Sequence, residues 1–99
     1  MELYFEWDEA KNQKNQKKHD VSFETASLIF DDPLRISMQD RHTNGEERWQ
    51  TIGLVGQLTI FVVHTWSEFD PLTGDETGRI ISARRATVHE RRSYEEETF

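Results

Sequence analysis

The run from Leu58 to Trp66 constrains the fold more than any other segment, because apolar residues occupy both of its alternating faces. A strand that is apolar on both faces has to be covered on both, so we place it in the middle of a sheet. The segments Arg35 to Asp40 and Arg48 to Leu54 precede it and read as neighbouring strands, and Gly56 lies in the turn before the run. The centre of the chain therefore predicts a sheet of strands joined by short turns.

The flanking segments combine helical and strand patterns. They are a strand from Leu3 to Trp7, helices from Glu9 to Lys18 and from Phe23 to about Phe30, a strand from Arg79 to Ala83 and a last helix through about Glu96. Asp8 and Ser22 stand where helix N-caps are expected, and Thr87 with Glu90 forms a capping box. The acidic stretch Ser67 to Gly78 is interpreted as a long exposed loop, and Thr43-Asn44-Gly45 as a turn.

The resulting order, β-α-α-β-β-β-β-α, predicts an α+β fold. We expect a mostly antiparallel sheet of four to five strands, two N-terminal helices and one C-terminal helix. A length of 99 residues fits a single domain over residues 1–99. The chain has no Cys and no stretch resembling a signal peptide or a membrane span, so a cytoplasmic protein without thiol chemistry is expected.

Charge is distributed unevenly along the chain. Twelve Lys and Arg against nineteen Asp and Glu give a net charge of -7, so any contact with nucleic acid has to be local. The basic residues form two blocks, one on the first helix (Lys11, Lys14, Lys17, Lys18 and His19) and one near the C-terminus (Arg79, Arg84, Arg85, Arg91 and Arg92), with Arg35 and Arg48 between them. These blocks either line one groove that binds phosphates or form two solvated faces.

Metal and nucleotide chemistry have little support in the sequence. The four His are not paired at ligand spacing, and no Gly-rich phosphate loop occurs, so no metal and no cofactor are expected. Acid–base chemistry remains, and RNA cleavage needs little more, because RNA supplies its own 2′-hydroxyl nucleophile. His19 is either an acid–base group or a helix C-terminal cap, His64 is interpreted as a core or interface residue, and His42 and His89 as surface residues.

Several short motifs, in this order and spacing, carry a family resemblance. They are Phe5-Glu6-Trp7-Asp8, Lys18-His19, Val21-Ser22-Phe23-Glu24, Phe30-Asp31-Asp32-Pro33, Arg79-Ile80-Ile81-Ser82-Ala83-Arg84 and Glu90-Arg91. Together they closely resemble the BrnT family, the ribonuclease toxins of a type II toxin–antitoxin system with a RelE-like fold. The chain departs from the pattern at Asp20, where the family usually has Gly, and in the length of the acidic connection after Ser67.

The resemblance implies a metal-independent endoribonuclease that cleaves mRNA through 2′-hydroxyl attack and slows translation. It implies a hetero-oligomer with a BrnA-like antitoxin, which silences the toxin and alone contacts operator DNA; no membrane is involved. The resemblance also implies site residues. Arg48 and Arg84 would bind the phosphate and transition state, His19 and Glu24 would transfer protons, and Lys11, Lys18, Arg79 and Arg85 would bind RNA.

Two alternatives stay open. In the first, a BrnT-like chain that has lost catalysis still binds an antitoxin and contributes to operon autoregulation. In the second, the chain is an α+β domain that binds an unrelated partner. Strand geometry also limits the site: in a regular strand, Arg79 and Arg84 lie on opposite faces and need a bend between them to line one groove. Arg84, next to the capping box, is the preferred site residue of the two.

Overall fold

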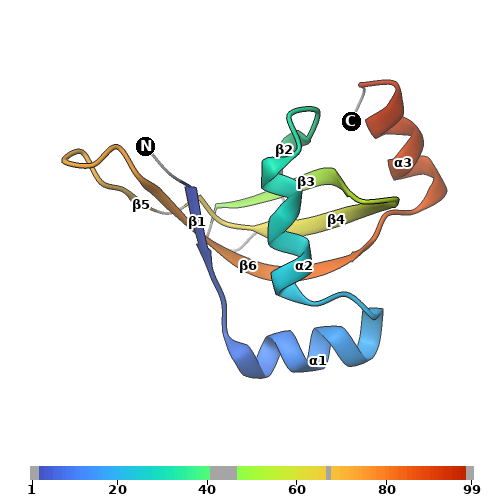
Figure 1. Ribbon diagram of the computed structural model, residues 1–99, viewed down its shortest axis with the longest axis horizontal. Helices are drawn as coiled ribbons and strands as arrows, with labels where there is room; N and C mark the ends of the chain where they lie inside the picture. The colour runs from blue at the N-terminus through green and yellow to red at the C-terminus, as the bar shows by residue number, and fades with distance from the viewer. Residues whose placement is uncertain (1–2, 41–46, 67, 98–99) are drawn as a thin grey trace.

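The computed structural model describes residues 3–40, 47–66 and 68–97. The elements follow the order β1 (Leu3–Glu6), α1 (Glu9–His19), α2 (Phe23–Ser27), the 3-10 helix η1 (Leu28–Asp31), β2 (Ile36–Asp40), β3 (Arg48–Val55), β4 (Leu58–His64), β5 (Glu68–Phe69), β6 (Glu76–Arg85) and α3 (Val88–Glu95) (Figure 1). The predicted turn Thr43-Asn44-Gly45 and His42 lie outside the described residues.

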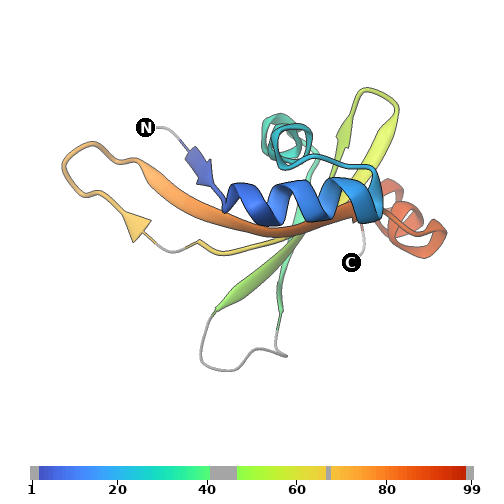
Figure 2. The ribbon, with the colours of Figure 1, turned by 90° about the horizontal axis from the view of Figure 1, so that it is seen from below.

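The strands form one sheet in the order β1-β6-β4-β3-β2, with the short β5 paired to β6. β1 runs parallel to β6, and the other pairs are antiparallel. The α+β fold and its mostly antiparallel sheet are therefore as predicted, and the doubly apolar β4 lies inside the sheet between β6 and β3. Figure 2 shows α1 alongside β6 and α2 over one side of the sheet.

The predicted caps are confirmed. The Asp8 and Ser22 side chains accept hydrogen bonds from the backbone N–H of Lys11 and Thr25, and the capping box of α3 is complete. Asp20 ends α1 in the left-handed conformation, with φ of 58°, which a short polar side chain tolerates better than most. The departure from Gly at this position is thus compatible with the turn.

Two elements differ from the prediction. The stretch after Ser67 is not one long loop, because β5 pairs with the start of β6 through Phe69 and Glu76 and makes a hairpin. The second helix is α-helical only to Ser27 and continues as the 3-10 turn η1. The acidic and turn-forming residues after Ser67 predict a loop, because the pairing of β5 with β6 depends on the sheet and not on local composition.

The core lies between the sheet and the α2–η1 segment. Phe23 and Ile29 pack with Ile60 and Val62 of β4, and all four are almost fully buried. Gly53 in β3 permits this close approach, since a Cβ atom there would lie 2.7 Å from the Ile29 Cβ. This contact seals the α2 side of the sheet.

α1 is held against the sheet by amides rather than by an apolar face. Asn15 donates to the carbonyls of Val21 (2.9 Å) and Ala83 (2.8 Å) and accepts from the Ala83 N–H (3.2 Å). Because β1 pairs only with residues 76–79 of β6, the Asn15 side chain satisfies the strand edge where β1 has ended. Buried Asn12 likewise accepts from the Phe23 N–H at 2.9 Å. Ala10 is the only apolar residue of α1, so these buried amides replace the apolar face that a packed helix usually has.

Candidate functional site

A β-bulge in β6 determines which arginines share a face. The pairing passes from Val63↔Ser82 to His64↔Ile80, which leaves Ile81 as an extra residue. The extra residue reverses the alternation, so Arg79 and Arg84 fall on the same face of the sheet. β6 is therefore not a regular strand, and the bulge provides the bend that Arg79 and Arg84 need in order to share a face.

Arg48 lies on this same face. The register aligns Ile52 of β3 with Phe61 of β4 and Arg84 of β6, and Arg48 is four residues from Ile52, so alternation keeps it on their side. Ile60 and Val62 point to the opposite side, toward α2. We call the side with Arg48, Arg79 and Arg84 the arginine face.

The three arginines are spaced for several phosphates rather than one. One residue beyond the Trp49↔His64 pair, Arg48 falls opposite Thr65. The Thr65 N–H in turn donates to the Arg79 carbonyl at 2.9 Å. Arg48 and Arg79 are thus two strands apart in one row, with Cα atoms about 10 Å apart, and Arg48 is about 16 Å from Arg84. One extended strand of nucleic acid could contact all three.

The Arg84 guanidinium is fixed on two sides. It forms a bidentate pair with Glu90 of α3, at 2.7 and 2.9 Å, and lies 4.2 Å from the centre of the Phe61 ring. The hydrogen bond to Glu90 raises the pKa of Arg84 against the opposing effect of burial. Burial would raise the pKa of Glu90, but the bonds from Arg84 and the Thr87 N–H lower it. The pair is ionised at neutral pH and ties α3 to the sheet.

A basic groove runs between α1 and β6. It consists of two adjoining cavities of about 340 and 250 Å³ that share Lys11 and Ile81. Trp7, Arg79 and the carboxylates of Glu6 and Asp8 line the first cavity. Lys14, Lys18, His19 and Ser82 line the second, which has no carboxylate in its lining. Ser82 lies on the arginine face, two residues from Arg84, so the groove adjoins that face.

The structure brings some predicted site residues together and separates others. Lys11, Lys18, His19 and Arg79 line the groove, next to the arginine face. Glu24 instead lies at the start of α2 and accepts from the Asn12 amide at 2.6 Å. Arg85 aligns with Ile60 on the α2 side and approaches Asp20 at 3.8 Å. Glu24 and Arg85 are therefore not assembled with Arg48 and Arg84.

Lys14 and Trp7 complete the groove but were not among the predicted site residues. The spacing of Lys11, Lys14 and Lys18 along α1, which places them on one helix face, was the signal available for Lys14. No local pattern signals the bulge at Ile81, because it results from pairing with β4.

Within residues 3–40, 47–66 and 68–97, no three His, Asp or Glu side chains are grouped so that they could hold a metal ion. In the same part of the chain, no helix is long and apolar enough to cross a membrane.

Fold and site together define a small α+β domain with an arginine-bearing sheet face and a lysine-lined edge groove, a surface suited to phosphate groups. The profile of a family described as "Ribonuclease toxin, BrnT, of type II toxin-antitoxin system" matches residues 7–90 of the chain. The chain therefore belongs to the BrnT family of ribonuclease toxins. No curated protein matches it.

Proposed function

We propose that this chain is a metal-independent endoribonuclease that cleaves mRNA in the cytoplasm and is inhibited by a cognate, BrnA-like antitoxin. Family membership supports the ribonuclease class. The observation that carries the assignment to this surface is the bulge that brings Arg79 onto the face of Arg48 and Arg84. Three guanidinium groups on one face, beside a lysine-lined groove, match the charge of an RNA backbone.

The reaction requires proton transfer and charge stabilisation. The 2′-hydroxyl oxygen attacks the adjacent phosphorus and loses its proton to a base, while the 5′-oxygen leaves and takes up a proton. The products are a 2′,3′-cyclic phosphate and a free 5′-hydroxyl. Arg84 would stabilise the negative charge of the pentavalent phosphorane, Arg48 would bind a phosphate further along the strand, and His19, in the groove, is the proposed proton-transfer group. Glu24 would act in this step only if the substrate reached the α2 side, so its assigned role is the less favoured.

End-labelled RNA incubated with the antitoxin-free chain in EDTA tests this proposal. We expect cleavage products with 2′,3′-cyclic phosphate ends and an at least about 100-fold lower rate for Arg84→Ala, which removes a charge from the transition state. Arg48→Ala removes a phosphate contact and should lower the rate at subsaturating RNA by about tenfold or more. Arg91→Ala, on the exposed surface of α3, is the matched control and keeps its rate. Full activity in both site variants contradicts the site assignment.

A second function is favoured by one feature of the site. Glu90 already binds two nitrogens of Arg84, and the chain carries a net charge of -7, which suits a protein that binds its antitoxin without cutting RNA. In that case the folded chain cleaves nothing in EDTA yet binds the antitoxin. Glu90→Gln separates the two: cleavage that appears or increases in this variant shows that Glu90 masks a competent Arg84.

A further inference from the structure

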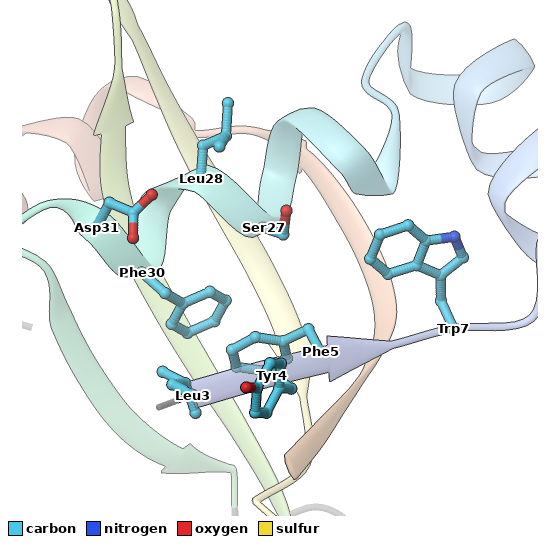
Figure 3. A pocket seen from close by; sticks show the side chains of 8 residues that line it. All are labelled: Leu3, Tyr4, Phe5, Trp7, Ser27, Leu28, Phe30 and Asp31. Carbon is cyan, nitrogen blue, oxygen red and sulfur yellow. The ribbon is translucent and has the colours of Figure 1, made fainter. Parts of the chain in front are cut away.

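One further cavity does not belong to the basic groove. It is a cleft of about 460 Å³ between β1 and the α2–η1 segment (Figure 3). Phe5, Phe30 and Trp7 line its apolar part, and Leu28 and Asp31 stand on the opposite wall from Tyr4. We call it the β1/α2 cleft. Its volume is within the range of about 300–1,000 Å³ that is typical of binding pockets.

The cleft exposes apolar surface on both walls. Tyr4 on β1 is 50% exposed and Leu28 on η1 is 49% exposed, whereas Phe30 between them is nearly buried. β1 is also the outermost strand on its side of the sheet in the described part of the chain, so the cleft opens along a sheet edge. An extended segment can lie along such an edge and place side chains into a neighbouring cleft.

The charges around the cleft select its occupant. Among the residues that line it, Asp31 carries the one charged side chain, a carboxylate, and there is no Lys, Arg or His. Phosphate groups would be repelled here, whereas the lysines of the α1 groove are on the other side of Trp7, which lines cavities on both sides. RNA therefore belongs to the groove, and a cationic apolar segment belongs to the cleft.

We propose that the β1/α2 cleft binds an extended segment of the antitoxin that places an apolar side chain against Phe5 and Phe30 and a Lys or Arg against Asp31. This inference rests on the proposed function, because it takes a protein antitoxin as the partner. The antitoxin then contacts the toxin on a surface that adjoins the RNA groove at Trp7. Such separation of charge lets the two ligands be recognised by different chemistry.

Hydrogen exchange of the purified toxin–antitoxin complex locates the contact without any substitution. We expect the complex to slow exchange at backbone amides of residues 3–6 and 23–31 relative to the free chain. Slowed exchange confined to α1 and the arginine face, or failure of the chain to form a complex with the antitoxin, would overturn the inference. Dimerisation of the free chain through this cleft would overturn it too.

Two substitutions then test the chemistry, with calorimetry of antitoxin binding as the measurement. Asp31→Lys reverses the charge and Leu28→Glu places a carboxylate on the apolar wall, and each should weaken binding by about tenfold or more. Glu95→Lys on α3 and Leu72→Glu in the β5–β6 hairpin make the same changes on exposed surface, and should leave affinity within about twofold of the original. Unchanged affinity in folded Asp31→Lys and Leu28→Glu chains contradicts the proposal.

The same proteins show whether the proposed function or the docking site has failed. Cleavage of RNA by the free Asp31→Lys chain should equal that of the original, because Asp31 lies outside the groove and the arginine face. A chain that never cuts RNA but whose antitoxin occupies the cleft refutes the ribonuclease proposal and keeps the docking site. An active chain whose antitoxin binds elsewhere supports the ribonuclease proposal and refutes the docking site.

Discussion

His64 lies in the core with three aromatic rings around it. The centres of the Phe5, Phe30 and Trp66 rings are 5.5, 4.9 and 5.0 Å from that of the imidazole. Its Nε2 lies 2.6 Å from the Thr51 hydroxyl, and its Nδ1 lies 3.3 Å from the Thr65 carbonyl. Burial lowers the pKa of His64 from 6.5 to about 4, so the ring is neutral at pH 7 and serves packing rather than proton transfer.

The buried imidazole makes stability depend on pH. Below pH 6.5 the unfolded chain takes up a proton on His64 before the folded chain does, because the folded pKa is about 4. The free energy of unfolding should therefore fall as the pH decreases from 6.5 toward 4, by at most about 3 kcal/mol from this residue. Urea titrations at several pH values measure this, and the slope should be shallower in His64→Leu. Equal slopes would mean that His64 is not the group responsible.

Outside the apolar core, we expect the largest loss of folding stability from substitution of Asn15. Removing its amide in Asn15→Ala leaves the Ala83 N–H and carbonyl and the Val21 carbonyl without this partner, at a cost of about 1–3 kcal/mol for each buried group that stays unsatisfied. Thermal denaturation should show a clearly lower melting temperature than for Gln16→Ala, an exposed position on the same helix. A melting temperature equal to that of Gln16→Ala would show that water replaces the amide.

At the scale of elements, α3 is held by polar contacts. None of its eight residues is buried. Two hydrogen-bonded contacts hold it to the rest of the fold: Glu90 accepts from Arg84, and the Tyr94 hydroxyl donates to Asp32 at 2.6 Å. Burial and the Asp32 carboxylate raise the pKa of Tyr94 to about 12. Burial opposes ionisation of Asp32, but the bonds from Tyr94 and from the Leu54 and Leu34 N–H groups hold the pKa of Asp32 below its ordinary value. The carboxylate thus joins three segments.

Removing one anchor should loosen α3 without unfolding the sheet. Tyr94→Phe deletes the hydroxyl that donates to Asp32, a charge-assisted bond that contributes about 1.5–3 kcal/mol. Amide exchange in α3 should become at least about tenfold faster, while exchange in β4 stays unchanged. Val88→Ala, at a position that is 57% exposed, provides the comparison within the same helix. If exchange in α3 is equal in the two variants, the Tyr94 contact does not hold the helix.

At the scale of the whole molecule, charge is separated in space although the net charge is -7. Lys11, Lys14 and Lys18 line the second cavity of the groove without a carboxylate among them, whereas the lining of the β1/α2 cleft has Asp31 and no basic residue. A strongly acidic chain can therefore still present a local site for RNA phosphates. The overall field slows the approach of RNA, and the groove provides the contact.

This separation predicts a salt-dependent affinity for RNA that is independent of cleavage. A 2′-O-methyl oligonucleotide, which lacks the nucleophile, should bind more weakly as salt rises. Lys14→Gln and Lys18→Gln should each reduce the slope of log affinity against log salt by about 0.7, the value for one lost phosphate contact in a single strand. Arg91→Gln on α3 should keep the original slope. Slopes that stay unchanged in both lysine variants would remove the groove from the RNA site.

Much of the fold could be read from local patterns. The caps at Asp8, Ser22 and Thr87 were predictable because each depends on a hydrogen bond within three residues, and β4 was placed centrally because both of its faces are apolar. The β5–β6 hairpin was missed because acidic and turn-forming residues conceal a strand whose partner is non-local. The buried Asn12 and Asn15 were missed because amides are ordinarily solvated.

The sequence by itself determined the order of the main helices and strands, the N-terminal caps of the helices, the basic character of α1 and membership of the BrnT family, because each of these depends on residues close together in the chain or on their order along it. Which side chains share a surface was decided only by the tertiary structure. One extra residue at Ile81 places Arg79 beside Arg48 and Arg84, and the packing of α2 leaves Glu24 on the other side of the sheet. The physical reason is that strand faces alternate with every residue, so pairing across the sheet determines which residues meet.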